Sequence, residues 1–319
     1  MVSCQPSYEK ENEKMQKAAS TTRDSLFAAF CLGTVLLSFA EISAVTDAMR
    51  EGLALCAHSV VPSLFPFFVL TSCILSSKRA VSLLSLPLHP LARLLGVSPE
   101  GAIAFLFGSL FGFPIGARVI AEGVRHGKIS IEEGERLLLF CNNASPAFLI
   151  GGVGLGMLGD AKAGAFLFAT QLFLSLLVGV VTRKKGGVFS PSSFCGYPKS
   201  FSDAVRDACL QVLTVCAYIL FFFVLSALFT SLLPLDPLRS IARALFEIGS
   251  GCAYASRLST VYALPFCAFA TCFSGFSVYF QCKDMIRQTP LTMKWYLPIK
   301  LLCGTLAALF TFFVLTQSG

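Results

Sequence analysis

The sequence predicts an all-α integral membrane protein with about seven crossings and two re-entrant hairpins, arranged in two inverted repeats. Three observations carry this prediction: the composition, the glycine and proline breaks in apolar runs, and the distribution of basic residues. Of 319 residues, 55% are hydrophobic and 13% are charged, whereas soluble domains carry about 25% charged residues. The mean hydropathy is +0.73. Lipid is therefore the solvent that this chain requires.

The chain opens with a polar N-terminal tail over residues 1–24, followed by an apolar run over residues 25–46. Lys14, Lys17 and Arg23 precede this run, which is the pattern of a signal anchor. A cleaved signal peptide is the alternative. Because Glu41 follows at once and no clear Ala-x-Ala site is present, we expect an uncleaved N-terminal transmembrane helix.

Eight further apolar runs follow, and a full crossing needs ~20 residues. They span residues 52–77, 98–123, 135–158, 162–183, 204–233, 238–257, 259–281 and 295–317. Two of them contain helix breakers, Phe111–Gly116 in the first case and Glu247–Gly251 in the second. Half-helices of about 10–12 residues reach only the midplane. These two runs therefore read as re-entrant hairpins, with full crossings as the alternative.

The distribution of Lys and Arg favours the hairpin interpretation. If both broken runs return to their own side, 20 of the 25 basic residues fall on one face. The loops on that face are 10–23, 78–93, 118–136, 183–206 and 283–300. If both runs cross, this bias largely disappears. The positive-inside rule thus places the N-terminus inside and the C-terminus outside.

The chain also repeats itself. The run Leu-Pro-Leu-His-Pro-Leu at 86–91 precedes the first broken run, and Leu-Pro-Leu-Asp-Pro-Leu at 233–238 precedes the second. Each unit reads as span, hairpin, broken span and span, which is an odd number of crossings. The units, residues 52–183 and 203–319, must therefore be inverted, with a cytoplasmic linker at 184–202. Such repeats are typical of secondary transporters, with the site where the breaks meet.

The first repeat supplies seven candidate substrate-binding residues. Gly112, Pro114 and Gly116 interrupt the hairpin, whereas Asn142, Asn143, Ser145 and Pro146 interrupt the broken span. Polar groups in lipid need partners, and Pro146 frees a backbone carbonyl that can bind a cation or a solute. The alternative is that the amides hydrogen-bond between helices and hold the bundle together.

The second repeat supplies Glu247, Ser250, Ser274 and Ser277. Glu247 carries a proton in one interpretation and pairs with Arg243 in the other. The segment with Ser274 and Ser277 either contacts the substrate or allows close helix packing.

Two basic residues, Arg118 and Lys300, are candidates for neutralising an anionic substrate. For Lys300, snorkelling to the headgroups is the favoured alternative.

Several functional classes lack support. The sequence contains no HExxH, Walker A or GxSxG motif, and its 13 cysteines include no CxxC pair. We therefore expect no enzyme, no metal and no cofactor other than a coupling H⁺ or Na⁺. The net charge of +7 does not indicate a nucleic-acid partner, because the basic residues lie in short loops between apolar runs. The expected partners are the bilayer, a small anionic solute and further copies of the same chain in a homo-oligomer.

Several runs resemble the YlbJ family of sporulation integral membrane proteins, in the wider Gate or nucleoside-recognition group. They are Gly112–Ala117, Ala121–Gly123, Gly127–Ser130, Phe140–Pro146 and Gly151–Gly154. The resemblance covers nearly all of the chain after the first span and is strongest over 108–159. The run Gly275-Phe276-Ser277-Val278-x-x-Gln281 resembles a Gly-Gly-Leu-Ser-Val-x-x-Gln stretch of that family. Here Ser274-Gly275-Phe276 stands in place of Gly-Gly-Leu, which weakens the match at that segment.

The resemblance implies a fold similar to that of concentrative nucleoside transporters. It also implies that the protein moves dipicolinic acid into the forespore during sporulation, across the outer forespore membrane, by alternating access. The chemistry is compatible, because half-helix N-termini attract anions and phenylalanines suit an aromatic ring. The alternative is a non-transporting scaffold that assembles a spore membrane complex.

Overall fold

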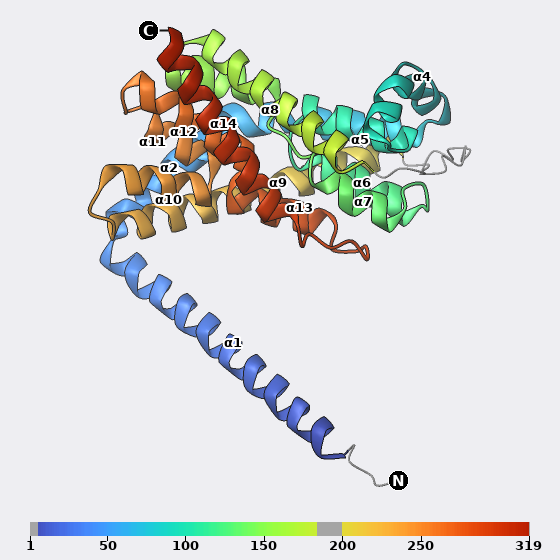
Figure 1. Cartoon of the computed structure of the whole chain (residues 1–319). Helices are drawn as coiled ribbons and strands as arrows, with labels where there is room; N and C mark the ends of the chain where they lie inside the picture. Colours follow the sequence, from blue (N-terminus) through green and yellow to red (C-terminus); the bar gives the residue numbers. More distant parts are fainter. Residues whose placement is uncertain (1–5, 184–199, 319) are drawn as a thin grey trace.

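The computed structural model describes residues 6–183 and 200–318, and every regular element in these two ranges is helical (Figure 1). The all-α prediction is confirmed. Six of the described helices are long and apolar enough to cross a membrane, or seven if one bent pair counts as a span.

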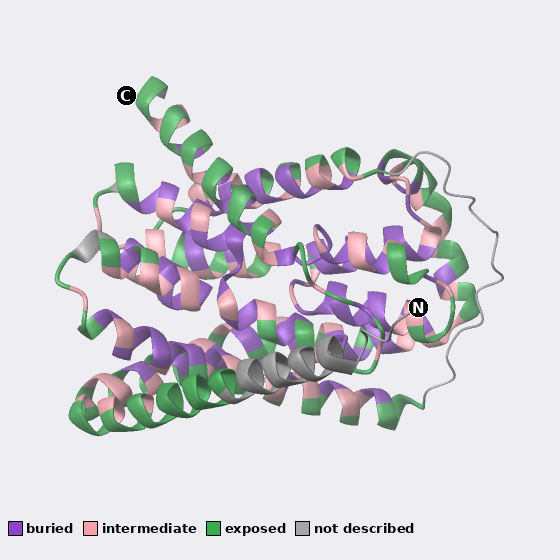
Figure 2. Ribbon diagram, turned by 60° about the horizontal axis from the view of Figure 1, so that its bottom comes forward, coloured by how far each residue is buried: buried purple, intermediate pink, exposed green. Residues whose placement is uncertain are grey.

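The first helix, α1 (Pro6–Ala40), stands apart from the bundle formed by the other helices (Figure 1). Its apolar part, Thr22–Ala40, has no buried residues (Figure 2). The helix begins inside the polar N-terminal tail and ends at Ala40, before the predicted boundary at residue 46. Exposed Leu36 and Phe39 on such a helix are suited to face lipid.

The next span is one helical rod over Ile42–Ser76. It consists of α2 (Ile42–Leu55), the π-helical segment η1 (Cys56–Val60) and α3 (Val61–Ser76). Pro66 lies inside α3, where the absence of its N–H removes one hydrogen bond of the helix.

The segment 78–93, which was predicted to be a loop, is helical. It forms most of α4 (Lys78–Leu95). The Ser77 hydroxyl accepts the Ala80 amide at its start, and Gly96, with φ +60°, ends it. Helix α5 (Pro99–Leu110) follows at an angle of 95° to α4, so the pair is a broken span or a re-entrant loop.

Both runs predicted as hairpins are pairs of short helices that pack against each other. The first pair is α5 with α6 (Ile115–Arg125), and the second is α10 (Asp236–Phe246) with α11 (Ile248–Ala255). The breaks fall at the glycine, proline and Glu247 positions that the sequence indicated.

The run 135–158, predicted to be a broken span, is not one continuous helix. It contains α7 (Ile131–Leu138), an irregular stretch and then the π-helical η2 (Ala147–Leu158). The remaining spans are α8 (Ala161–Val181), α9 (Phe201–Ser231), α12 (Thr260–Phe273) with α13 (Gly275–Met285), and α14 (Tyr296–Ser318). Most of the predicted linker, 184–199, lies outside the described residues.

Candidate functional site

The tip of each hairpin lies against the break of the broken span in its own half. In the first half, a Cβ atom on Gly112 would lie 3.2 Å from the Ser145 Cβ. In the second half, a Cβ atom on Gly275 would lie 3.2 Å from the Phe246 carbonyl oxygen and 3.4 Å from the Glu247 amide nitrogen. Both glycines have positive φ, +91° and +69°. Glycine is needed at both places, because backbone and neighbour leave little room for a side chain.

Both meeting points open on one central cavity of about 50 Å³. Gly112, Phe113, Ala144 and Ser145 line it from the first half, and Glu247, Ile248, Val278 and Gln281 line it from the second. The residues that complete its wall are mainly apolar: Leu55, Val60, Ser63, Leu64, Phe148, Val215 and Ile219. A buried water needs about 10–15 Å³ of such volume. The cavity therefore has room for a few waters, and an aromatic solute requires it to widen.

The break at residues 139–146 leaves a backbone carbonyl without its helical hydrogen bond, and a lysine side chain donates to this carbonyl. Pro146 has no N–H for the carbonyl of Asn142, four residues earlier. The Lys300 Nζ donates to this carbonyl oxygen at 2.6 Å. Lys300 is buried, so the preferred prediction that it snorkels to the headgroups is wrong. The cation that the freed carbonyl binds belongs to the protein itself.

The amides of the first break are fully engaged with protein groups. Asn143 donates to the Ser109 hydroxyl (3.1 Å) and the Phe140 carbonyl (3.0 Å), and it accepts from the Ser175 hydroxyl (2.6 Å). Gln171, which was not among the predicted site residues, forms hydrogen bonds with both backbone groups of Ala144. Its Oε1 accepts the Ala144 amide at 3.1 Å, and its Nε2 donates to the Ala144 carbonyl at 3.0 Å.

Asn142 joins the break to the hairpin. Its Oδ1 accepts the Ala117 amide at 2.9 Å, near the start of α6, and its Nδ2 donates to the Leu138 carbonyl. Gly116 packs directly on the Cys141 carbonyl, leaving no room for a Cβ atom. Pro114, which follows a cis peptide bond, is the residue preceding α6. These contacts match the bundle-stabilising alternative for the asparagines, whereas Gly112 and Ser145 line the cavity.

Glu247 faces the cavity and caps a helix. Its side chain is 5% exposed and accepts the Ser250 amide at 2.6 Å, which satisfies an N–H in the first turn of α11. No ion pair in the described part of the chain joins it to Arg243, whose guanidinium lies over the Tyr254 ring at 4.8 Å. The Ser250 hydroxyl lies 3.3 Å from that of Ser226. Within residues 6–183 and 200–318, the carboxyl group thus has a dipolar partner and no cationic one.

The second break carries fewer side-chain bonds. Ser274, with φ 74°, donates to the Thr271 carbonyl at 3.3 Å, and Ser277 accepts from Gln281 Nε2 at 3.0 Å. Gln281 is 2% exposed and lines the cavity, yet its Oε1 has no hydrogen-bond partner. Sequence analysis did not choose Gln281, although an amide inside an apolar helix was a sufficient signal.

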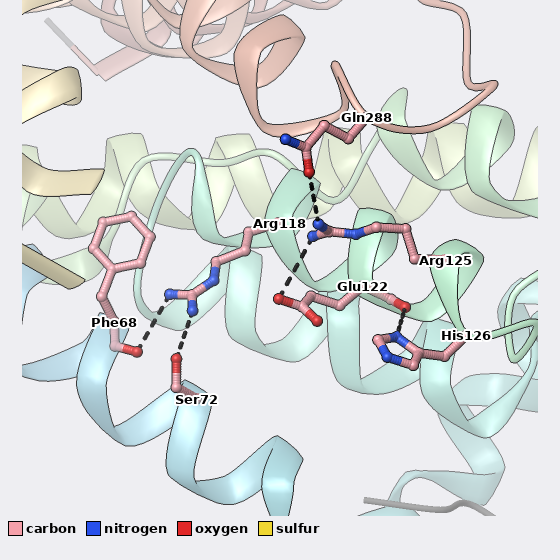
Figure 3. Close-up of polar contacts among 7 residues, drawn as sticks. All are labelled: Phe68, Ser72, Arg118, Glu122, Arg125, His126 and Gln288. Carbon is pink, nitrogen blue, oxygen red and sulfur yellow. Dashed lines mark hydrogen bonds and ion pairs between the residues drawn. The ribbon is translucent and has the colours of Figure 1, made fainter. Parts of the chain in front are cut away.

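Arg118 is buried at a distance from this cavity wall, on α6 facing α3 (Figure 3). It donates to the Ser72 hydroxyl and the Phe68 carbonyl, and it lies 5.4 Å from the Phe68 ring centroid. Arg125, about two helix turns further along α6, reaches Glu122 and Gln288 instead. The structure does not bring Arg118 to the same wall as Glu247.

No group of three or more His, Cys, Asp or Glu residues within 6–183 and 200–318 is placed to hold a metal ion. The described cysteines are free, including the buried Cys141, Cys252, Cys267, Cys272, Cys282 and Cys303.

Comparison with known proteins gives one informative relative. The chain is 26% identical to the sporulation integral membrane protein YlbJ of Bacillus subtilis over an alignment of 333 positions, gaps included, which covers 89% of this chain and 81% of that protein. This similarity supports a YlbJ-like family and extends across most of both chains. No protein-family model matches the sequence, and no solved structure matches it.

Proposed function

We propose that this protein is a secondary transporter that moves a small anionic solute across a membrane by alternating access. One observation carries the proposal, the central cavity that the hairpin tips and broken spans of both halves line together. A midplane site between interrupted helices is the arrangement that transporters with inverted repeats use. In this state the cavity is small, as expected of a closed conformation.

The solute class follows from the relative and from the family resemblance. The similar protein of Bacillus subtilis is named for sporulation, and the resemblance implies dipicolinic acid as the cargo. The proposed location is the outer forespore membrane, and the proposed fold class is that of the Gate group. The apolar and phenylalanine-containing wall of the cavity suits an aromatic ring.

The charge of Glu247 indicates how an anion enters. A buried carboxylate in a mainly apolar cavity wall repels a dianion strongly, because the effective dielectric constant is low there. The repulsion disappears when Glu247 takes up a proton. We therefore propose that the coupling ion is H⁺ rather than Na⁺, and that the proton and the solute occupy the cavity together. The protein performs no covalent chemistry in this scheme.

The test is uptake of radiolabelled dipicolinate into proteoliposomes, with and without a pH gradient. The wild type is expected to accumulate the solute in the presence of the gradient. Glu247→Gln is expected to lose the dependence on the gradient, because a neutral amide cannot carry the proton. Arg93→Gln, an exposed change on α4, is the matched control and should behave as the wild type.

A folded and correctly oriented wild-type protein without dipicolinate uptake would contradict the proposed solute. If a panel of other small carboxylates also gave no uptake, the scaffold alternative would replace the transporter.

A further inference from the structure

A second cavity, of about 600 Å³, lies against the segment that joins α13 to α14. Every charged side chain that lines it is basic: Lys283, Arg287 and Lys294. The Tyr279 ring and the hydroxyl-bearing Thr289 and Thr292 complete its polar lining. The positive-inside rule predicts that this segment lies on the cytoplasmic face.

The three cations have no anionic partner in the described part of the chain. The Lys283 Nζ lies 5.9 Å from the Tyr279 ring centroid, and the side chains of Arg287 and Lys294 are exposed. Asp284 follows Lys283 in sequence but does not line the cavity. One exposed lysine attracts an anion weakly, but three cations around a concave wall focus their field on the space between them.

The wall of this cavity is held in place by α7. Glu135 Oε1 accepts both the Thr292 amide, at 2.9 Å, and the Thr292 hydroxyl, at 2.7 Å. Tyr296, just beyond the loop, is fully buried. The Glu135 carboxylate is therefore occupied by hydrogen bonds to the loop. The three basic side chains that line the cavity remain available to a ligand.

A chain of contacts leads inward from this cavity to the central one. The Tyr279 and Tyr296 ring centroids are 5.9 Å apart, and the Lys300 Nζ lies 5.9 Å from the Tyr296 centroid. Lys300 donates to the Asn142 carbonyl, two residues before Ala144 in the wall of the central cavity. A buried cation without a carboxylate partner thus lies between the basic cavity and the break.

We infer that the basic cavity is an anion-binding vestibule, which captures the carboxylates of a small aromatic acid on the cytoplasmic side before the central cavity opens. The inference rests on the proposed transport function for the identity of the ligand. Phosphate groups of anionic lipids share this oxyanion chemistry. The Tyr279 ring beside the three cations favours the aromatic acid over a headgroup.

The chain carries its own reporter for this site. Trp295 is the single tryptophan, follows Lys294 directly and is 69% exposed. The full-length protein, in nanodiscs of neutral phosphatidylcholine, is titrated with dipicolinate and with the aliphatic dicarboxylate glutarate while Trp295 emission is followed. We expect a saturable change in emission with both acids, at lower concentration for the aromatic one, and weakening at high salt.

The variant Lys283→Gln/Arg287→Gln/Lys294→Gln should raise the midpoint by about tenfold or more, since steering and local concentration by such fields are of this order. The matched control, Lys78→Gln/Arg79→Gln/Arg93→Gln, removes three exposed positive charges from the same predicted face on α4 and should leave the midpoint unchanged.

If the midpoint rose equally in both triple variants, the cavity would not be a specific site, because the effect would then come from general surface charge. The absence of any saturable change would overturn it as well. If only nanodiscs with phosphatidylglycerol alter the emission of the wild type, and not that of the cavity variant, the occupant is a lipid and the vestibule is refuted. Binding without uptake would refute the transport proposal alone.

Discussion

The two broken spans differ in how they satisfy their polar groups. The first break is the more polar in sequence, and its two asparagines are occupied by Ser109, Ser175, Ala117 and backbone carbonyls. The second break looks poorer, yet it leaves the Gln281 carbonyl unpaired in the cavity wall, beside a hairpin that presents Glu247. The more polar break is therefore satisfied within the protein, whereas the less polar one leaves an amide oxygen without a partner in the cavity wall.

The first break should be intolerant of added volume where it packs against the hairpin. In Gly116→Ala the new Cβ atom would overlap the Cys141 carbonyl oxygen, so the break must move away from the hairpin. Overpacking costs about 1–3 kcal/mol and sometimes more. We expect little or no folded protein by size-exclusion chromatography. Gly151→Ala, where nothing lies within 4 Å of the added atom, is the control and should fold normally.

The second expected effect concerns Asn143. Asn143→Ala removes three hydrogen bonds inside the bundle, each worth about 1 kcal/mol, and leaves hydroxyls without partners. A loss of about 2–4 kcal/mol should appear as a lower melting temperature in detergent, while uptake per folded molecule stays near the wild-type rate. An equally stable variant that lacks uptake would reverse the comparison and make the first break the binding segment.

The third prediction separates the two roles proposed for Glu247, capping α11 and carrying a proton. Asn is as good an N-cap as an acid and carries no charge, whereas Ala provides no cap and costs about 1 kcal/mol. Glu247→Asn should therefore keep the thermal stability that Glu247→Ala loses, and both should lose the dependence of uptake on the pH gradient. Retained gradient dependence in Glu247→Asn would show that Glu247 only caps α11.

The smallest effect on stability is expected at Gln281. Gln281→Met keeps most of the volume and removes a carbonyl that already lacks a partner, so the melting temperature should change little. Uptake should show a KM raised several-fold, because a buried polar group that meets the solute is lost. A strongly destabilised variant with unchanged KM would assign Gln281 to packing through its bond to Ser277.

The breaks were predictable because glycine and proline act locally. Phe111–Gly116, the stretch before Pro146, Glu247 and Ser274–Gly275 all interrupt helices where the sequence indicated. Helix α4 was not predictable from charge alone, since a basic amphipathic helix and a basic loop have the same Lys and Arg count. The length of the break in the run 135–158 was not predictable, because the irregular stretch takes seven residues out of the helix, from Leu139 to Ser145.

The solvent, the helical class and the helix breaks could be predicted from residue types, because transfer of each apolar run into lipid and the backbone limits of Gly and Pro are local properties. Which polar groups are satisfied and which remain open depends on the packing of the folded chain. Lys300 finds the Asn142 carbonyl across 158 residues, and Gln171 finds Ala144 across 27. Hydrogen-bond partners depend on packing between distant segments, and a pattern of residue types carries no record of that packing.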